Sequence, residues 1–260
     1  MIHGILHTGS GLGNQLHRYV ATRVLAEDKG LEFSMIGQEN FKGKDFMEVD
    51  LGKPNNITYS IGPGGEVLPN TQLARFSEKK VLENGVDIRS YDPEINFVED
   101  NTIIDGEFQD SKYFNHRLED VAHWLKTKQL WMPDDTCVIG FRGGEFQYIP
   151  DLFLPREYYE DAMKLMRDMN PNMKFMAVTD DPATASKILP PEVKITHEIA
   201  TDWRMIRCAN YLIISNSSFY ILPALLNKHA KMVLAPRFWA RRNTGTWALP
   251  SNYYPQFRYI

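Results

Sequence analysis

The chain has 260 residues, a charged fraction of 24% and a formal net charge of −4. This length suits one large or two small globular domains, and the charge excludes a global positive field for nucleic acid or an anionic membrane. No apolar run reaches the roughly twenty residues that a membrane span requires. The only cysteines, Cys137 and Cys208, lie in apolar runs, where free buried thiols are expected. We therefore expect a cytoplasmic protein with at most peripheral membrane contact.

The chain begins with a predicted strand, a glycine loop and a helix. Residues 1–7 are short and apolar, residues 8–15 contain three glycines, and an apolar stripe follows at Leu16, Tyr19, Val20, Val24 and Leu25. The loop has the spacing G-x-G-x-G, whereas the dinucleotide fingerprint is G-x-G-x-x-G. Such a loop can bring the backbone close to a ligand, or it can allow tight packing of strand and helix. The sequence leaves both interpretations open.

The rest of the first half is less regular. Strands are predicted at residues 31–36 and 102–105, and a helix at residues 115–128. Residues 37–101 are rich in glycine, proline and asparagine and predict no clear element. Residues 129–135 read as a linker, so we expect one domain over residues 1–132 and a second over residues 133–260.

The second half is a regular series of strands and helices. Strands are predicted at residues 136–141, 175–178, 193–196, 211–214 and 232–235, with the last of these closing the series. Helices are predicted between them, at residues 158–169, 183–189, 202–209 and after residue 218. This alternation predicts an α/β protein with parallel sheets.

Three polar segments follow predicted strands of this half: residues 142–145, 179–181 and 216–218. Ligands of parallel sheets bind beyond the carboxyl ends of the strands, so these segments are candidates for one site. The planar guanidinium of Arg142 suits phosphate oxygens, and Asn216 or Ser217 could cap a helix whose N-terminus favours an anion. The alternatives are a surface ion pair of Arg142 with Glu145 and an ordinary capped turn.

Carboxylates provide further candidates. Asp202 could accept two hydrogen bonds from guanine, or it could be the N-cap of its helix. Glu145 could be a general base if burial raises its pKa, or simply a salt-bridge carboxylate. The acidic pairs Asp180–Asp181 and Asp105–Glu107 are the best metal candidates, but no strict Asp-x-Asp and no histidine pair beside a carboxylate occurs. We therefore expect no metal site.

Five short motifs run through the chain in order: residues 11–15 (GLGNQ), 106–114 (GEFQDSKYF), 138–146 (VIGFRGGEF), 175–181 (FMAVTDD) and 202–227, which includes NSSF. In this order they resemble the motifs of the α-1,2-fucosyltransferases of glycosyltransferase family 11, over nearly the whole chain. The resemblance implies a GT-B-like fold, in which two Rossmann-like halves with parallel sheets face a central cleft. It also implies inverting transfer of a sugar from a GDP-sugar, usually GDP-fucose, to a glycan acceptor, with no obligatory metal or other cofactor.

The resemblance also implies roles for individual residues. Arg142 would contact the diphosphate; in the mechanism that we expect, it is a catalytic group and Glu145 is the candidate base. Asp202 would read guanine, and Ser217 and Ser218 would hold phosphate oxygens. Asn216 and Phe219 would complete the donor site of the second half, and the first half, the expected acceptor side, would line the cleft with Gly11, Gly13, Asn14 and Gln15.

The chain departs from the family pattern at several positions. Gly140 stands where the family has histidine, Gly143 where it has a second arginine, and Glu145 where it has aspartate. A tryptophan pair is replaced by Ile221 and Leu222. The diphosphate would therefore meet less positive charge, unless an arginine from elsewhere substitutes; the candidates are Arg18, Arg237 and Arg241.

These departures keep rival functions open. The protein could be a decayed GDP-sugar-binding protein, or a transferase that uses a different nucleotide sugar. A metal-dependent glycosyltransferase of the other common fold would use Asp105 and Glu107. The hypothesis of a Rossmann oxidoreductase is supported only by the glycine loop. After the second predicted strand, Ile36-Gly37-Gln38 provides no acidic residue that could bind a ribose.

Overall fold

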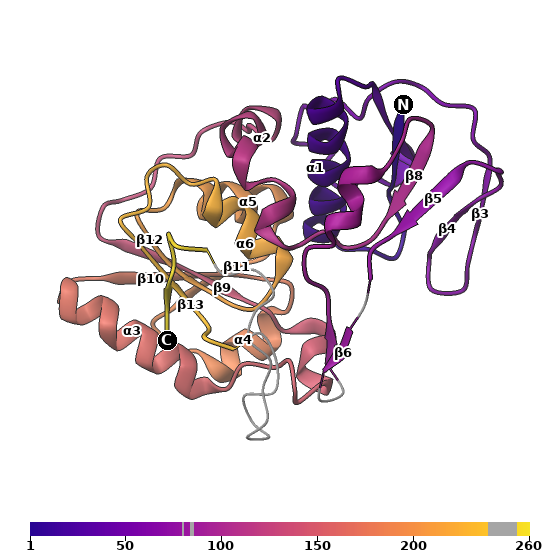
Figure 1. The fold of residues 1–260 in the computed structure, drawn as a ribbon. Helices are drawn as coiled ribbons and strands as arrows, with labels where there is room; N and C mark the ends of the chain where they lie inside the picture. The colour runs from indigo at the N-terminus through magenta and orange to yellow at the C-terminus, as the bar shows by residue number, and fades with distance from the viewer. Residues whose placement is uncertain (80, 84–85, 239–253) are drawn as a thin grey trace. The chain divides into compact units, whose positions relative to one another are not determined.

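The computed structural model describes residues 1–79, 81–83, 86–238 and 254–260 (Figure 1). The chain divides into two compact units. Unit 1 comprises Met1–Leu82 and Asp87–Thr127, and unit 2 comprises Glu83–Val86 and Lys128–Ile260. The division after Thr127 precedes the expected boundary at residue 132, and the assignment of acceptor and donor sides to the two halves remains a prediction.

Unit 1 is built on a four-stranded parallel sheet. Its strand order is β2 (Phe33–Ile36), β1 (Ile2–Ile5), β8 (Thr102–Asp105) and β5 (Ala74–Ser77). Helix α1 (Leu12–Lys29) packs on β1 and β2, and Ile5, Ile36 and Ile103 pack with Val67 of an antiparallel hairpin. That hairpin joins β3 (Tyr59–Ile61) to β4 (Val67–Pro69). The remaining elements of the first half are η1 (Gln38–Asn40), β6 (Val81–Glu83), β7 (Val86–Ile88), η2 (Pro93–Phe97), η3 (Ser111–Tyr113), η4 (Asn115–Arg117) and α2 (Leu118–Trp124).

Unit 2 contains a six-stranded sheet in which every pairing is parallel. Its order is β11 (Lys194–Thr196), β10 (Lys174–Thr179), β9 (Thr136–Phe141), β12 (Tyr211–Ile214), β13 (Met232–Ala235) and β14 (Arg258–Tyr259). Numbered along the chain this is 3-2-1-4-5-6, the order of dinucleotide-binding Rossmann sheets. The direction in which strands are added reverses between β9 and β12, and ligands of such sheets bind at this reversal.

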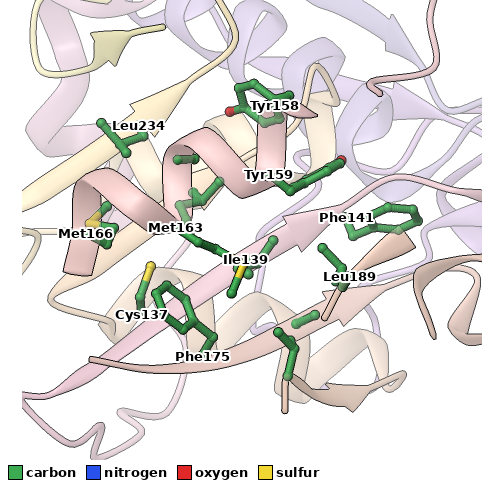
Figure 2. Packing of buried hydrophobic residues seen from close by; sticks show 14 of the residues in the cluster. Cys137, Ile139, Phe141, Tyr158, Tyr159, Met163, Met166, Phe175, Leu189 and Leu234 are labelled. Carbon is green, nitrogen blue, oxygen red and sulfur yellow. The ribbon is translucent and has the colours of Figure 1, made fainter. Parts of the chain in front are cut away.

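Helices cover both faces of this sheet. Helices α3 (Arg156–Met169) and α4 (Pro182–Ile188) lie on one face, and α5 (Ile199–Cys208) and α6 (Ser218–Leu225) on the other (Figure 1). Figure 2 shows α3 over the strands, with Met163 beside Ile139 of β9, and Met166 belongs to the same buried cluster. Both methionines are buried core residues. Cys137 and Cys208 are buried and free, as predicted.

The structure differs from the sequence predictions in three parts of the chain. Residues 37–101, where no strand was predicted, contain β3 to β7, and β5 pairs with β8 in the sheet of unit 1. The helix expected at residues 115–128 is the short η4 followed by α2, which ends at Trp124. Residues 232–235 are not the last strand, because β14 adds to β13. The strands that the sequence analysis missed in the two sheets, β5 and β14, are short, and each pairs with a strand more than twenty residues away along the chain, as in the register pairs Ala74–Thr102 and Leu234–Arg258.

Among the described helices, none combines the length and the apolar character needed to cross a membrane.

Candidate functional site

The carboxyl ends of β9 and β12 bring two predicted segments together in unit 2. Ile214 is in register with Gly140, and the Ser215 amide donates to the Gly140 carbonyl at 3.0 Å. Beyond the strands, the Asn216 side-chain amide donates to the Leu152 carbonyl at 2.9 Å. The loop that begins with Arg142 and the turn that leads into α6 therefore start side by side, at the point where strand order reverses.

Arg142 is held by two carboxylates. Its Nη1 lies 2.6 Å from Asp180 Oδ2, and its Nη2 is ion-paired with Glu145 Oε1. The guanidinium also lies over the Phe146 ring, 5.0 Å from its centroid. The ion pair with Glu145, which the sequence offered as the alternative to phosphate binding, is present. A diphosphate that approaches Arg142 would therefore meet a guanidinium that already has anionic partners.

The two glycines that depart from the family pattern have packing roles. A Cβ on Gly140 would lie 2.7 Å from Tyr220 Cγ, and one on Gly143 would lie 2.6 Å from Asp181 Cβ. The Tyr220 hydroxyl donates to the Phe141 carbonyl at 2.7 Å, so its ring is fixed across β9. The Gly143 amide donates to Asp180 Oδ1 at 2.9 Å. The Tyr220 ring of α6 and the Asp181 side chain, which directly precedes α4, thus occupy the space that larger residues would need at positions 140 and 143.

The turn before α6 presents hydroxyl groups. Ser217 is the N-cap residue by position, but its side chain makes no capping hydrogen bond. Ser215, which the sequence analysis did not select, has a buried Oγ with no hydrogen-bond partner among the described residues. The first amides of any helix lack intrahelical partners, and they favour an anion there. Phe219, predicted to line the donor site, packs edge-on against Trp203 with ring centroids 5.9 Å apart.

Asp202 is buried, with 4% of its surface exposed. Its Oδ1 accepts from the Thr196 hydroxyl at 2.9 Å, and its Oδ2 accepts from the Glu198 amide at 3.3 Å. Burial raises the pKa of this carboxyl to about 6, against the opposing effect of these hydrogen bonds. The N-cap alternative is wrong: Glu198 caps α5, which begins at Ile199, and Asp202 lies one turn inside the helix.

The glycine loop of unit 1 is organised by internal contacts. Gln15 is fully buried; its Nε2 donates to the carbonyls of His7 and Asn40, and its Oε1 accepts from the Lys42 amide. The prediction that Gln15 lines a cleft is therefore wrong, since its amide is used to hold the loop at residues 40–42. Asn14 accepts from the Gln109 side chain at 3.0 Å.

The glycines of this loop differ in exposure. Gly11 is exposed at the N-cap of α1, and a Cβ there would meet no atom within 4 Å. Gly13 is buried inside α1, where its carbonyl lies 2.8 Å from His17 Nδ1. Gly9 donates its amide to Gly65, in the turn of the β3–β4 hairpin. Gly9 is exposed but packs against the hairpin turn rather than between strand and helix, whereas Gly11 has open space where a Cβ would lie.

A charged cluster at the carboxyl ends of β1 and β8 was not anticipated. Buried Arg18 of α1 contacts Asp105 at 3.2 Å and Glu107 at 2.8 Å. Asp105 also contacts Arg75 at 2.5 Å and His7 Nε2 at 3.4 Å. Burial alone would raise the pKa of Asp105, but the hydrogen bonds from His7 and Arg75 and the nearby arginine charges hold it well below its usual range. In the sequence, the only local indication of this cluster was the acidic pair Asp105–Glu107.

From the sequence, three arginines could supply the missing positive charge at the diphosphate. Arg18 is used within this cluster. Arg237 is exposed and lies over the Phe238 ring. Arg241 lies outside the described residues. The described residues contain no group of three or more histidine, cysteine or acidic side chains that could hold a metal ion.

We compared the chain with known proteins. No protein-family model and no curated protein sequence matches it. Among solved structures, NodZ alpha-1,6-fucosyltransferase soaked with GDP-fucose matches 97% of this chain and 99% of its own, with a TM-score of 0.52 and 11% identity. The chain has a GT-B-like fold. The same enzyme co-crystallized with GDP gives a TM-score of 0.47 at 11% identity, over 97% of this chain and 98% of its own. At this identity the likeness establishes the α/β fold with its parallel sheets.

Proposed function

We propose that this protein is an inverting glycosyltransferase that moves L-fucose from GDP-fucose to a hydroxyl of a glycan acceptor. Unit 2 would bind the donor and unit 1 the acceptor. The five sequence motifs support a place as a divergent member of glycosyltransferase family 11. The fold shared with a fucosyltransferase soaked with GDP-fucose supports the donor assignment.

One observation carries the proposal. In unit 2, Arg142 and the serine turn of α6 follow β9 and β12, the two strands between which the order of the Rossmann sheet reverses. A guanidinium and a helix N-terminus at this place together suit a diphosphate, because both offer donors to its oxygens. The unpartnered Ser215 hydroxyl adds one more polar group there.

In the proposed reaction, an acceptor hydroxyl oxygen attacks C1 of the sugar while the bond from C1 to the phosphate oxygen breaks. GDP leaves with the bonding electrons, and the configuration at C1 inverts. Arg142 and the α6 amides would stabilise the negative charge that develops on the diphosphate; losing such a group commonly costs on the order of 10²–10³ in rate. Glu145 is the predicted base, and would take the hydroxyl proton after leaving its ion pair with Arg142.

The test begins with nucleotide binding. GDP should raise the melting temperature more than UDP or ADP, because a ligand that binds only the folded state stabilises it. Arg142→Ala should abolish the shift with GDP. Arg167→Ala is the matched control, since Arg167 is an exposed arginine of the same unit, paired with Glu192. Equal shifts for all three nucleotides, or an unchanged shift in Arg142→Ala, would contradict the donor assignment.

Transfer itself is tested with GDP-fucose and a panel of glycan acceptors, with the linkage and anomeric configuration of the product determined by NMR. We propose that no metal is required, because three carboxylates of the best acidic pairs, Asp105, Glu107 and Asp180, contact arginines, which a cation would have to displace. Activity should therefore persist in EDTA. A strict requirement for a divalent cation would instead favour the metal-dependent alternative.

A second candidate function has its own support. The space at Gly140 and Gly143 is filled, and both carboxylates at Arg142 reduce the positive charge available to a leaving diphosphate. A GDP-sugar-binding protein without transferase activity would tolerate these features. Saturable binding of GDP with no turnover of GDP-fucose or another GDP-sugar on any acceptor would favour this function.

A further inference from the structure

We propose that the two carboxylates at Arg142 have different roles: Asp180 is a positioning residue that orients the guanidinium, and Glu145 competes with the diphosphate for it. The proposal rests on the proposed function, since it concerns the same diphosphate site. Asp180 would orient the guanidinium for the diphosphate, and the ion pair of Glu145 would lower the affinity for GDP.

Asp180 is built into the end of the sheet. It follows β10 directly, and the preceding residue, Thr179, is in register with Phe141, so Asp180 lies beside Arg142. Its two oxygens have separate tasks: Oδ2 contacts Arg142 Nη1 at 2.6 Å, and Oδ1 accepts from the Gly143 amide at 2.9 Å. A Cβ on Gly144 would lie 2.4 Å from Oδ2, which means that the loop closes tightly over this carboxylate.

Glu145 has a different setting. It lies in the 3-10 helix η5 (Gly144–Tyr148), and 64% of its side chain is exposed, against 28% for Asp180. Its carboxylate forms an ion pair with Arg142 Nη2. An exposed pair of this kind contributes little net stability, because water solvates both partners and a long side chain loses freedom. Glu145 can therefore give up Nη2 at small cost.

The two edges of Arg142 thus differ in how firmly they are held. Asp180 fixes Nη1 through a short, partly buried contact, and the Phe146 ring supports the guanidinium from one face. The Nη2 edge is occupied by the exposed carboxylate. A diphosphate oxygen that replaces Glu145 there would find the guanidinium already oriented, and would release Glu145 next to the reacting groups.

The experiment compares binding of GDP and guanosine to Asp180→Asn, Asp180→Glu and Glu145→Gln by calorimetry. Glu145→Gln should bind GDP about two- to fivefold more tightly, since it removes the competing charge. Asp180→Asn should bind GDP about tenfold more weakly, although it also removes a negative charge, because a charge-assisted hydrogen bond is lost. Asp180→Glu keeps the charge but displaces the carboxylate, and it should also weaken binding. Guanosine, which lacks phosphates, should bind all variants equally.

The control is Glu192→Gln, which removes an exposed ion-paired carboxylate of the same unit and should leave GDP affinity unchanged. If both Glu145→Gln and Asp180→Asn bind GDP more tightly, the carboxylates act only through charge and the positioning role is overturned. If guanosine affinity falls together with GDP affinity, Asp180 is merely structural and the proposal is again overturned. Failure of the wild-type protein to bind GDP would instead contradict the proposed function.

Discussion

Tyr220 lies directly over Gly140. A Cβ at position 140 would come within 2.7 Å of the ring, while the Tyr220 hydroxyl bonds to the carbonyl of Phe141 and is buried. The histidine that the family pattern has at this position would have no room. The glycine and the tyrosine are therefore one structural feature, contributed by residues 80 positions apart in the sequence.

We expect this pair to be coupled energetically. Gly140→Ala should lower the free energy of unfolding by about 1–3 kcal/mol, since overpacking forces neighbouring groups to move. In a Tyr220→Ala background the same substitution should cost much less, because the ring is absent. Urea denaturation of the four proteins gives the coupling free energy. Equal costs of Gly140→Ala in both backgrounds would mean that the ring does not constrain position 140.

Asp202→Asn should stabilise the protein at neutral pH. The folded-state pKa of Asp202, about 6, lies above the unfolded value near 3.8. The folded state therefore binds the proton more tightly, and stability falls as pH rises from about 4 to 6. Above pH 6 the buried charge costs on the order of 3 kcal/mol. Asparagine avoids this cost and can still bond Thr196 and the Glu198 amide.

The measurement is urea denaturation of Asp202→Asn and the wild type at several pH values. The variant should be more stable by about 1–3 kcal/mol at pH 8 and about equal at pH 4. Asp161→Asn, an exposed substitution on α3, is the control. A variant that is less stable at pH 8 would show that the carboxylate is stabilising. If Asp202 reads guanine as predicted, the same variant should also lose the preference for GDP.

The effect of Asp105→Asn on stability should depend on pH in the opposite sense to the effect of Asp202→Asn. The pKa of Asp105 is depressed in the folded state, so its contribution to stability is present above the unfolded pKa near 4 and is lost as pH falls through the folded value. We expect the substitution to destabilise the protein by about 2–3 kcal/mol at pH 7, because Arg18 would lose a buried partner. The difference from the wild type should shrink toward pH 2. Asp45→Asn, at an exposed site of the same unit, should show neither effect.

Cys137 should be unreactive in the folded protein. Burial raises the pKa of its thiol well above the usual range, and the thiolate is the species that reacts. Ellman's reagent should therefore modify Cys137 only in denaturant, as followed by mass spectrometry of the labelled peptide. Rapid labelling under native conditions would mean that this part of the core opens on the timescale of the assay.

Much of the architecture could be predicted from local patterns. The apolar runs at residues 102–105, 136–141, 211–214 and 232–235 are strands with those bounds. Asp181 before Pro182 caps α4, as its position predicts. Alternation of strands and helices implied parallel sheets, and this placed the segments after β9, β10 and β12 at one edge. These features could be predicted because each depends on residues that are close together in the chain.

The sequence by itself determined the α/β class, the parallel sheets and the polar segments at the carboxyl ends of the strands of unit 2. Only the tertiary structure decided what those residues contact. Arg18 donates to Asp105, 87 positions away in the sequence, and the Gln15 side chain donates to the Asn40 carbonyl. Asp202 is buried beside Thr196, and Arg142 lies between Asp180 and Glu145. Burial and charge pairing arise when distant segments pack together, and no local pattern specifies which partners will meet.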